Sequence, residues 1–149
     1  MAIVFETNNF LIAAPEKPHV SRTDGGHLVV VPKVEVEDRT KLTAPLAIEL
    51  MKLTMLAGET LRTVMTARGI EIGRINYQDN GNWTPHLHIH IYGRAKGAVL
   101  QPYGAPLRFP ATRKEFEDTP ALEPLHEDDI AEIRTEIEKL LKSEKYRNF

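Results

Sequence analysis

The six-residue run HLHIHI, which begins at His86, constrains the fold more than any other part of this chain. Imidazole and aliphatic side chains alternate in it, and a period of two is typical of a β-strand with one buried face. His86, His88 and His90 then share one face, and the leucine and isoleucines between them share the other. We therefore expect a strand over residues 86–92, with its aliphatic face in the core and its imidazoles in one row.

The rest of the chain shows the patterns of further strands and of two helices. Apolar residues spaced by three or four predict a long helix over 43–68, with Thr43 as a cap and Gly69 as the stop. A second apolar stripe predicts a final helix over 127–145, and strands are predicted at 2–6, 9–14, 27–33 and 70–77. Because short links join the strands, we expect them to be antiparallel. This order predicts an α+β fold.

Residues 94–125 have no regular period and are interrupted by prolines. A structureless stretch of about 30 residues is unusual in a compact domain and is often functional. We expect an irregular arm or flap over 94–125 and a C-terminal helix within 126–149. With no internal repeat and no linker, the chain is interpreted as a single domain over 1–149.

Composition limits the classes of partner and chemistry. The chain has 19 Lys+Arg against 21 Asp+Glu, which favours neither a nucleic-acid duplex nor an acidic membrane as partner. No apolar run approaches the roughly 20 residues that cross a bilayer. The absence of cysteine excludes disulfides, thiol catalysis and cysteine-ligated zinc, and it suits a reducing compartment. The N-terminus lacks the basic region of a signal peptide, so we expect a cytoplasmic protein.

The histidine row has three chemical interpretations. It could be a half-exposed strand that happens to be rich in histidine. It could bind a metal ion, because neutral imidazole is a good ligand, although no Asp or Glu lies close in sequence. It could also attack phosphorus, with one imidazole as nucleophile and its neighbours as orienting groups and phosphate donors.

At this point the sequence resembles a known family. The segment His86–Tyr92 matches the histidine-triad motif, histidine–apolar–histidine–apolar–histidine–apolar–apolar. The upstream segment HLVVVPK, which begins at His27, is similar to the strand that precedes the triad in that family, and the long helix falls where the family has its main helix. The resemblance covers about residues 1–95. It implies an α+β fold, mainly antiparallel sheet, with one long helix packed on it and a C-terminal helix.

The resemblance also implies an activity. The chain would be a hydrolase that cleaves a nucleoside 5′-monophosphate from a phosphoramidate or a dinucleoside polyphosphate. His88 would be the nucleophile that forms a nucleotidyl-histidine intermediate, while His86 and His90 would bind phosphoryl oxygens and the leaving group. Free imidazole has a pKa of about 6.5, so it is largely neutral and nucleophilic at pH 7. The alternatives are a nucleotide-binding module with little turnover and a metal-binding histidine cluster.

Four more residues belong to the implied substrate site. His27 would support the triad from the neighbouring strand, and Asn76 would donate a hydrogen bond to phosphate. Thr84 would replace a hydroxyl that contacts phosphate, and Trp83 could stack on a base. The resemblance implies a small-molecule nucleotide as substrate, no cofactor, no metal ion, and pairing into a homodimer.

One position departs from the family pattern. Eight residues before the upstream histidine the family usually has an acidic residue or asparagine, which binds the ribose hydroxyls. This chain has His19 there, and its nearby acidic residues are Glu16 and Asp24. The ribose contact is therefore left without an assigned residue.

Overall fold

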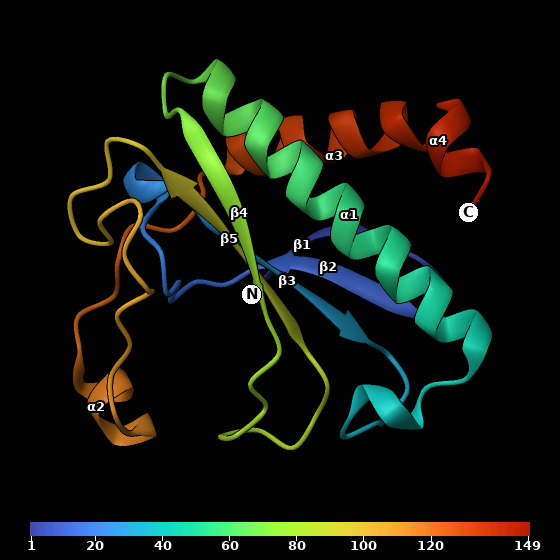
Figure 1. Cartoon of the computed structure of the whole chain (residues 1–149), viewed down its shortest axis with the longest axis horizontal. Helices are drawn as coiled ribbons and strands as arrows, with labels where there is room; N and C mark the ends of the chain where they lie inside the picture. Colours follow the sequence, from blue (N-terminus) through green and yellow to red (C-terminus); the bar gives the residue numbers. More distant parts are fainter.

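A five-stranded antiparallel sheet forms the centre of the computed structural model, which describes all 149 residues (Figure 1). The strand order is β1-β2-β3-β5-β4. The strands are β1 (Ala2–Glu6), β2 (Phe10–Ala14), β3 (His27–Pro32), β4 (Ile72–Gln78) and β5 (Ile89–Ala95). The α-helices are α1 (Ala44–Ala67), α2 (Arg113–Asp118), α3 (Glu127–Leu141) and α4 (Glu144–Arg147). This architecture confirms the predicted α+β fold.

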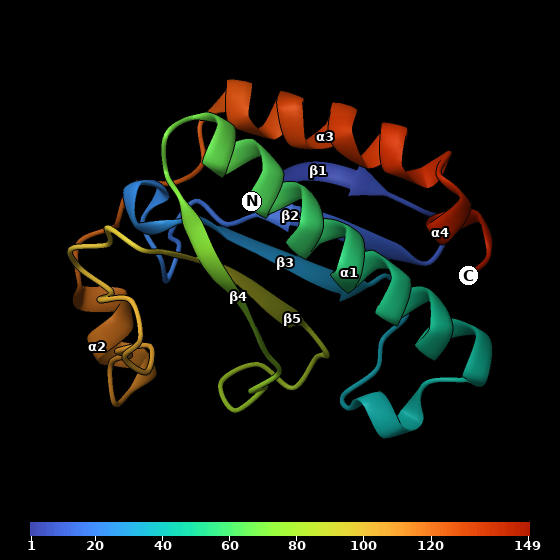
Figure 2. The same cartoon turned by 45° about the horizontal axis from the view of Figure 1, so that its top comes forward.

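Helices α1 and α3 lie side by side over one face of the sheet (Figure 2). The apolar stripe of α1 buries Leu53 and Leu61 against the strands, and α3 adds Ile133 and Ile137 to the same core. Helix α1 begins after Thr43 and ends before Gly69, which adopts a φ of +84° that favours glycine. None of the helices combines the length and hydrophobicity that a membrane crossing requires.

Strand β5 is shifted by three residues from the predicted 86–92 to Ile89–Ala95. It begins later because Leu87 donates its backbone N–H to Val36, beyond the end of β3, instead of continuing the ladder. It ends later because β4 pairs with it as far as Ala95. The alternation still holds, since Leu87, Ile89 and Ile91 are all buried in the core.

The C-terminal region also differs from the prediction of one helix over 127–145. Helix α3 ends at Leu141, Lys142 is its C-cap, and Ser143 is the N-cap of the separate helix α4. The Ser143 hydroxyl donates a hydrogen bond to the Leu140 carbonyl at 2.6 Å, which satisfies a carbonyl in the last turn of α3.

The region from 96 to 125, here called the arm, contains one short helix, α2, and is otherwise irregular. Three buried polar residues attach it to the domain. Asp24 accepts the backbone N–H groups of residues 99, 100 and 101 at 2.7–2.9 Å. Arg94 donates to the carbonyls of Pro102 and Ala105, and Gln101 donates to the His19 carbonyl at 3.3 Å. Within the arm, Gln101 also bonds both backbone groups of Arg108. Hydrogen bonds from buried polar side chains thus join the arm to the rest of the fold.

Candidate functional site

Two cavities meet at His88 and His90. The first, of about 350 Å³, is lined by the loop of residues 80–84 and by arm residues 109–111. The second, of about 300 Å³, extends along β3 and the segment around Pro15. His19 and Thr84 line both cavities, and no carboxylate lines either of them. An anionic phosphate at the shared boundary would therefore meet imidazoles and hydroxyls without a facing negative charge.

The orientation of His88 follows from one hydrogen bond. Its Nδ1 lies 2.6 Å from the backbone carbonyl oxygen of His86. A carbonyl only accepts, so Nδ1 carries the hydrogen and the neutral ring holds its lone pair on Nε2. This Nε2 has no hydrogen-bond partner within the protein, and it is not buried. His88 therefore presents an unprotonated nitrogen to the cavity.

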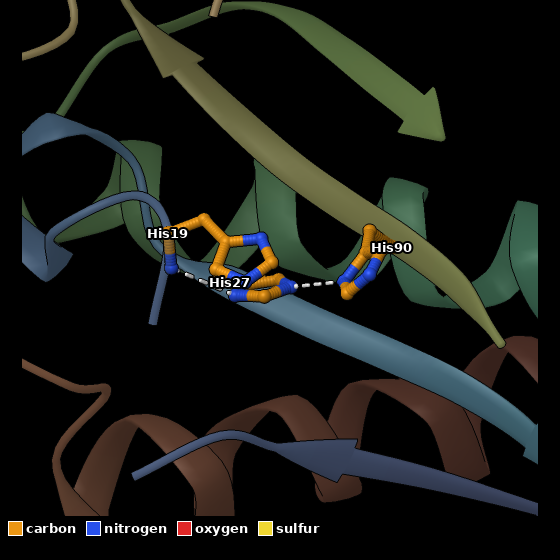
Figure 3. A group of neighbouring side chains, drawn as sticks. All are labelled: His19, His27 and His90. Carbon is orange, nitrogen blue, oxygen red and sulfur yellow. Dashed lines mark hydrogen bonds between the residues drawn. The ribbon is translucent and has the colours of Figure 1, made fainter. Parts of the chain in front are cut away.

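The hydrogen on His90 is fixed by a chain of two hydrogen bonds (Figure 3). The backbone N–H of His19 donates to His27 Nδ1 at 3.1 Å, so in the neutral ring Nε2 of His27 carries the hydrogen. That Nε2 lies 2.9 Å from His90 Nδ1, to which it donates. The remaining hydrogen of His90 is then on its Nε2. His90 presents a donor to the cavity, next to the acceptor nitrogen of His88.

Burial keeps this histidine cluster neutral. Loss of water lowers the pKa of His19 to about 4 and that of His90 to about 3. The pKa of His27, which is 2% exposed, lies well below its usual value for the same reason. The neighbouring imidazoles add to each shift because their charged forms would repel one another. The hydrogen-bond directions deduced for the neutral rings of His27 and His90 therefore apply at pH 7.

The structure brings most of the sequence-predicted residues together. His86 reaches the second cavity, but its Nε2 donates to the Pro32 carbonyl at 3.0 Å, so it acts on His88 through its own carbonyl. His27 lies behind His90 and is almost fully buried. Thr84 lines both cavities and Trp83 lines the first.

Asn76 is the predicted residue that the structure places elsewhere. It lies within β4, opposite Tyr92, and its amide oxygen accepts from Arg94 at 2.7 Å. It lines neither cavity, whereas Asn80 and Asn82 of the following loop line the first. The amide groups near the histidines therefore come from the loop rather than from the strand, and Asn76 serves to hold Arg94.

Sequence reasoning did not assign His19 or the aromatic residues of the arm to the site. His19 packs against the rings of His27 and His90, each with a centroid distance of 4.7 Å, and its Nδ1 lies 2.7 Å from the Tyr92 hydroxyl. The signal for His19 was its position eight residues before His27, where a ribose-binding residue was expected. Glu16 instead pairs with the N-terminal amine.

The cluster of His19, His27 and His90 is the arrangement nearest to a metal site around the cavities, because one nitrogen of each lies within 4.8 Å of the others. Two nitrogens that bind one tetrahedral Zn²⁺ at 2.0–2.1 Å are about 3.3 Å apart, and both point at the ion. Here His27 Nε2 and His90 Nδ1 face each other at 2.9 Å. The geometry favours a hydrogen bond between these two nitrogens over joint coordination of a metal ion.

A family model described as the HIT domain matches residues 1–97, about two thirds of the chain. This chain therefore belongs to the HIT, or histidine-triad, family, as its triad predicts. The family includes nucleotide-binding hydrolases and transferases. A comparison with curated proteins found no significant match.

Solved structures show the same fold. A histidine triad protein from Bradyrhizobium japonicum aligns with a TM-score of 0.65 at 16% identity, over 91% of this chain and 89% of its own. A hypothetical histidine triad nucleotide-binding protein from Sulfolobus tokodaii aligns with a TM-score of 0.62 at 20% identity, over 94% of this chain and 85% of its own. A zinc-bound histidine triad family protein from Mycobacterium smegmatis gives 0.59 at 19%, over 93% and 84%.

Proposed function

We propose that this protein hydrolyses a nucleoside 5′-phosphoramidate or a dinucleoside polyphosphate, releasing a nucleoside 5′-monophosphate. The observation that carries the proposal is the pair of cavity-facing nitrogens on His88 and His90. One holds a lone pair, fixed by the His86 carbonyl at 2.6 Å, and the other holds a hydrogen. A nucleophile beside a donor is what displacement at a phosphoryl group requires.

The proposed reaction has two displacements. In the first, His88 Nε2 forms a bond to the α-phosphorus, and the bond from phosphorus to the leaving group breaks. An amine leaving group takes a proton from solvent, and His90 Nε2–H donates to a phosphoryl oxygen as negative charge develops there. In the second, water forms the new P–O bond, the P–Nε2 bond breaks, and the water proton passes to solvent.

The test is hydrolysis of an adenosine 5′-phosphoramidate and a diadenosine polyphosphate by the wild type and by His88→Asn. We expect the wild type to act with or without EDTA and the variant to lose about 10³-fold or more in kcat. His126→Asn is the control, since this exposed histidine lies at the start of α3 and asparagine is a good N-cap. Equal activity of the wild type and His88→Asn would refute the mechanism.

The binding-module alternative makes a different prediction for the same experiment. Neither protein would turn over either substrate, while the wild type would bind a nucleoside monophosphate in calorimetry. A metal-dependent reaction would be abolished by EDTA. These outcomes separate nucleophilic catalysis by His88 from both alternatives.

We further propose that the protein is a cytoplasmic homodimer. The absence of cysteine is compatible with that compartment. Support for the dimer comes from β4, which is an edge strand of the sheet, and from the groove beside it. This groove is lined mainly by apolar residues, and Met51 and Tyr77 on its rim are 55% and 51% exposed. An unpaired edge next to an apolar surface suits a second copy of the chain.

A further inference from the structure

Three aromatic rings form a continuous surface beside the histidines. Trp83, from the loop before the triad, has ring-centroid distances of 5.3 Å to Phe109 and 5.9 Å to Phe116. The two phenyl rings are nearly parallel, with centroids 5.8 Å apart. We call these three residues the aromatic shelf. Phe109 and Phe116 lie beyond residues 1–97, so the arm rather than the HIT domain supplies two of the three rings.

Only the ring of His19 separates the aromatic shelf from His90. The rings of His19 and Phe109 meet nearly at right angles at a centroid distance of 4.4 Å, and His19 in turn packs on His90 at 4.7 Å. Trp83 and Phe109 line the same cavity as His88. A phosphate held at the histidines would therefore place an attached planar group within reach of the shelf.

The shelf is held in place before any substrate binds. Asp24 and Gln101 fix the arm up to Arg108, the residue next to Phe109. Arg113 of α2 donates to the Trp83 carbonyl at 3.2 Å and so links the helix that carries Phe116 to the loop. Rings that are ordered in advance lose little entropy when a ligand stacks on them.

Exposure argues that the shelf does more than pack the arm onto the domain. Phe109 is 38% exposed, and Trp83 is only partly buried. Aromatic residues that only join two parts of a core are normally covered, whereas stacking platforms leave a face open. Asn80, Asn82 and Thr84 on the cavity wall add hydrogen-bonding groups that suit the edge of a heterocycle.

Resting on the proposed function, we infer that the aromatic shelf binds a planar aromatic group of the substrate and so determines its specificity. The group is either the nucleobase or an aromatic leaving group, since both are joined to the phosphate and both offer a π-face. The arm would thus be the specificity element of the site.

Three substrates distinguish a nucleobase from an aromatic leaving group as the planar group that the shelf binds. Adenosine 5′-(propyl)phosphoramidate carries only a base, ribose 5′-(tryptamine)phosphoramidate carries only an aromatic leaving group, and ribose 5′-(propyl)phosphoramidate carries neither. The kcat/KM of each is measured for the wild type, Phe109→Ala and Trp83→Ala. The control is Phe149→Ala, which alters an exposed aromatic residue at the C-terminus.

We expect both shelf variants to lower kcat/KM about 10-fold or more on the substrate whose aromatic group stacks. Activity on ribose 5′-(propyl)phosphoramidate should stay within about 3-fold of wild type, as should the control on all substrates. The substrate that is affected identifies the source of the ring. If both variants lower all three substrates equally, or lower none, the inference is wrong.

Failure of the proposed function would give a separate result. If the wild type cleaves none of the three compounds, calorimetry with AMP and ribose 5-phosphate tests the shelf for a nucleobase without requiring turnover. A shelf that stacks the base makes AMP bind more tightly than ribose 5-phosphate, and Phe109→Ala removes most of that difference. Equal affinities in the wild type, or no effect of Phe109→Ala, would overturn the inference for such a protein.

Discussion

Acidification is expected to destabilise this protein through the buried histidines His19, His27 and His90. Their folded-state pKa values are lowered, to about 4 for His19, to about 3 for His90 and well below 6.5 for His27. In the unfolded chain each imidazole regains a pKa of about 6.5. Between pH 6.5 and pH 4 the unfolded state therefore binds more protons than the folded state. Stability is fully present above pH 6.5 and falls as the pH falls.

The size of the effect follows from the same linkage. Each of these histidines lowers the free energy of unfolding by about 1.4 kcal/mol per pH unit below 6.5, which amounts to about 2 kcal/mol at pH 5. The three together account for at most about 6 kcal/mol, a large part of the 5–15 kcal/mol typical of a folded domain. The carboxyl groups of Glu59 and Asp129, whose pKa values are also lowered, reduce the free energy of unfolding only at a lower pH, where the unfolded carboxyl groups take up protons.

Urea unfolding followed by circular dichroism at pH 7.5, 6 and 5 measures this loss. His90→Gln should reduce the difference in unfolding free energy between pH 7.5 and pH 5 by about 2 kcal/mol. Phe149→Ala should leave the difference unchanged, because this exposed side chain carries no group that binds a proton. The reasoning is refuted if the wild type is equally stable at pH 7.5 and pH 5. A parallel decline of wild type and His90→Gln would refute it as well.

Two further predictions concern the arm and the proposed dimer. Asp24→Asn replaces a carboxylate that accepts three backbone N–H groups, so the free energy of unfolding should fall by about 2–4 kcal/mol and the thermal midpoint by roughly 5–10 °C. An unchanged midpoint in calorimetry would show that Asp24 does not hold the arm. Met51→Lys places a charge in the apolar groove, so light scattering should give twice 16.9 kDa for the wild type and 16.9 kDa for the variant. A monomeric wild type would exclude the dimer.

The sequence predicts those parts of the fold and site that depend on local patterns. Helix α1 and the buried alternation around Ile89 follow from periodicity, because one face of each element meets the core. The triad was recognisable because its residues are adjacent in sequence. The start of β5 was not predictable, since it depends on the hydrogen bond from Leu87 to Val36, far away in the chain.

Local sequence patterns do not identify the remaining residues of the candidate site, because these residues also come together through contacts between distant parts of the chain. His19 meets Tyr92 across 73 positions, and Asp24 meets Leu100 across 76. Phe109 lies in a stretch without a period, so nothing in its neighbours indicates that it reaches the cavity. The structure places Asn76 outside both cavities. The sequence does not show this, because two asparagines a few positions apart look alike until the strand and the loop are placed. Only the fold distinguishes Asn76 from Asn80.

His19 has two roles that belong to different parts of the residue, because its main chain bonds to His27 while its side chain lines the cavity. The donor that decides which nitrogen of His90 carries a hydrogen is an amide, and every amino acid except proline supplies it. The imidazole of His19, by contrast, contacts the cavity and the aromatic rings. Evolution could therefore exchange the side chain at position 19 to suit another ligand while the proton arrangement of His27 and His90 is inherited unchanged. A proline there is the one replacement that would alter both at once.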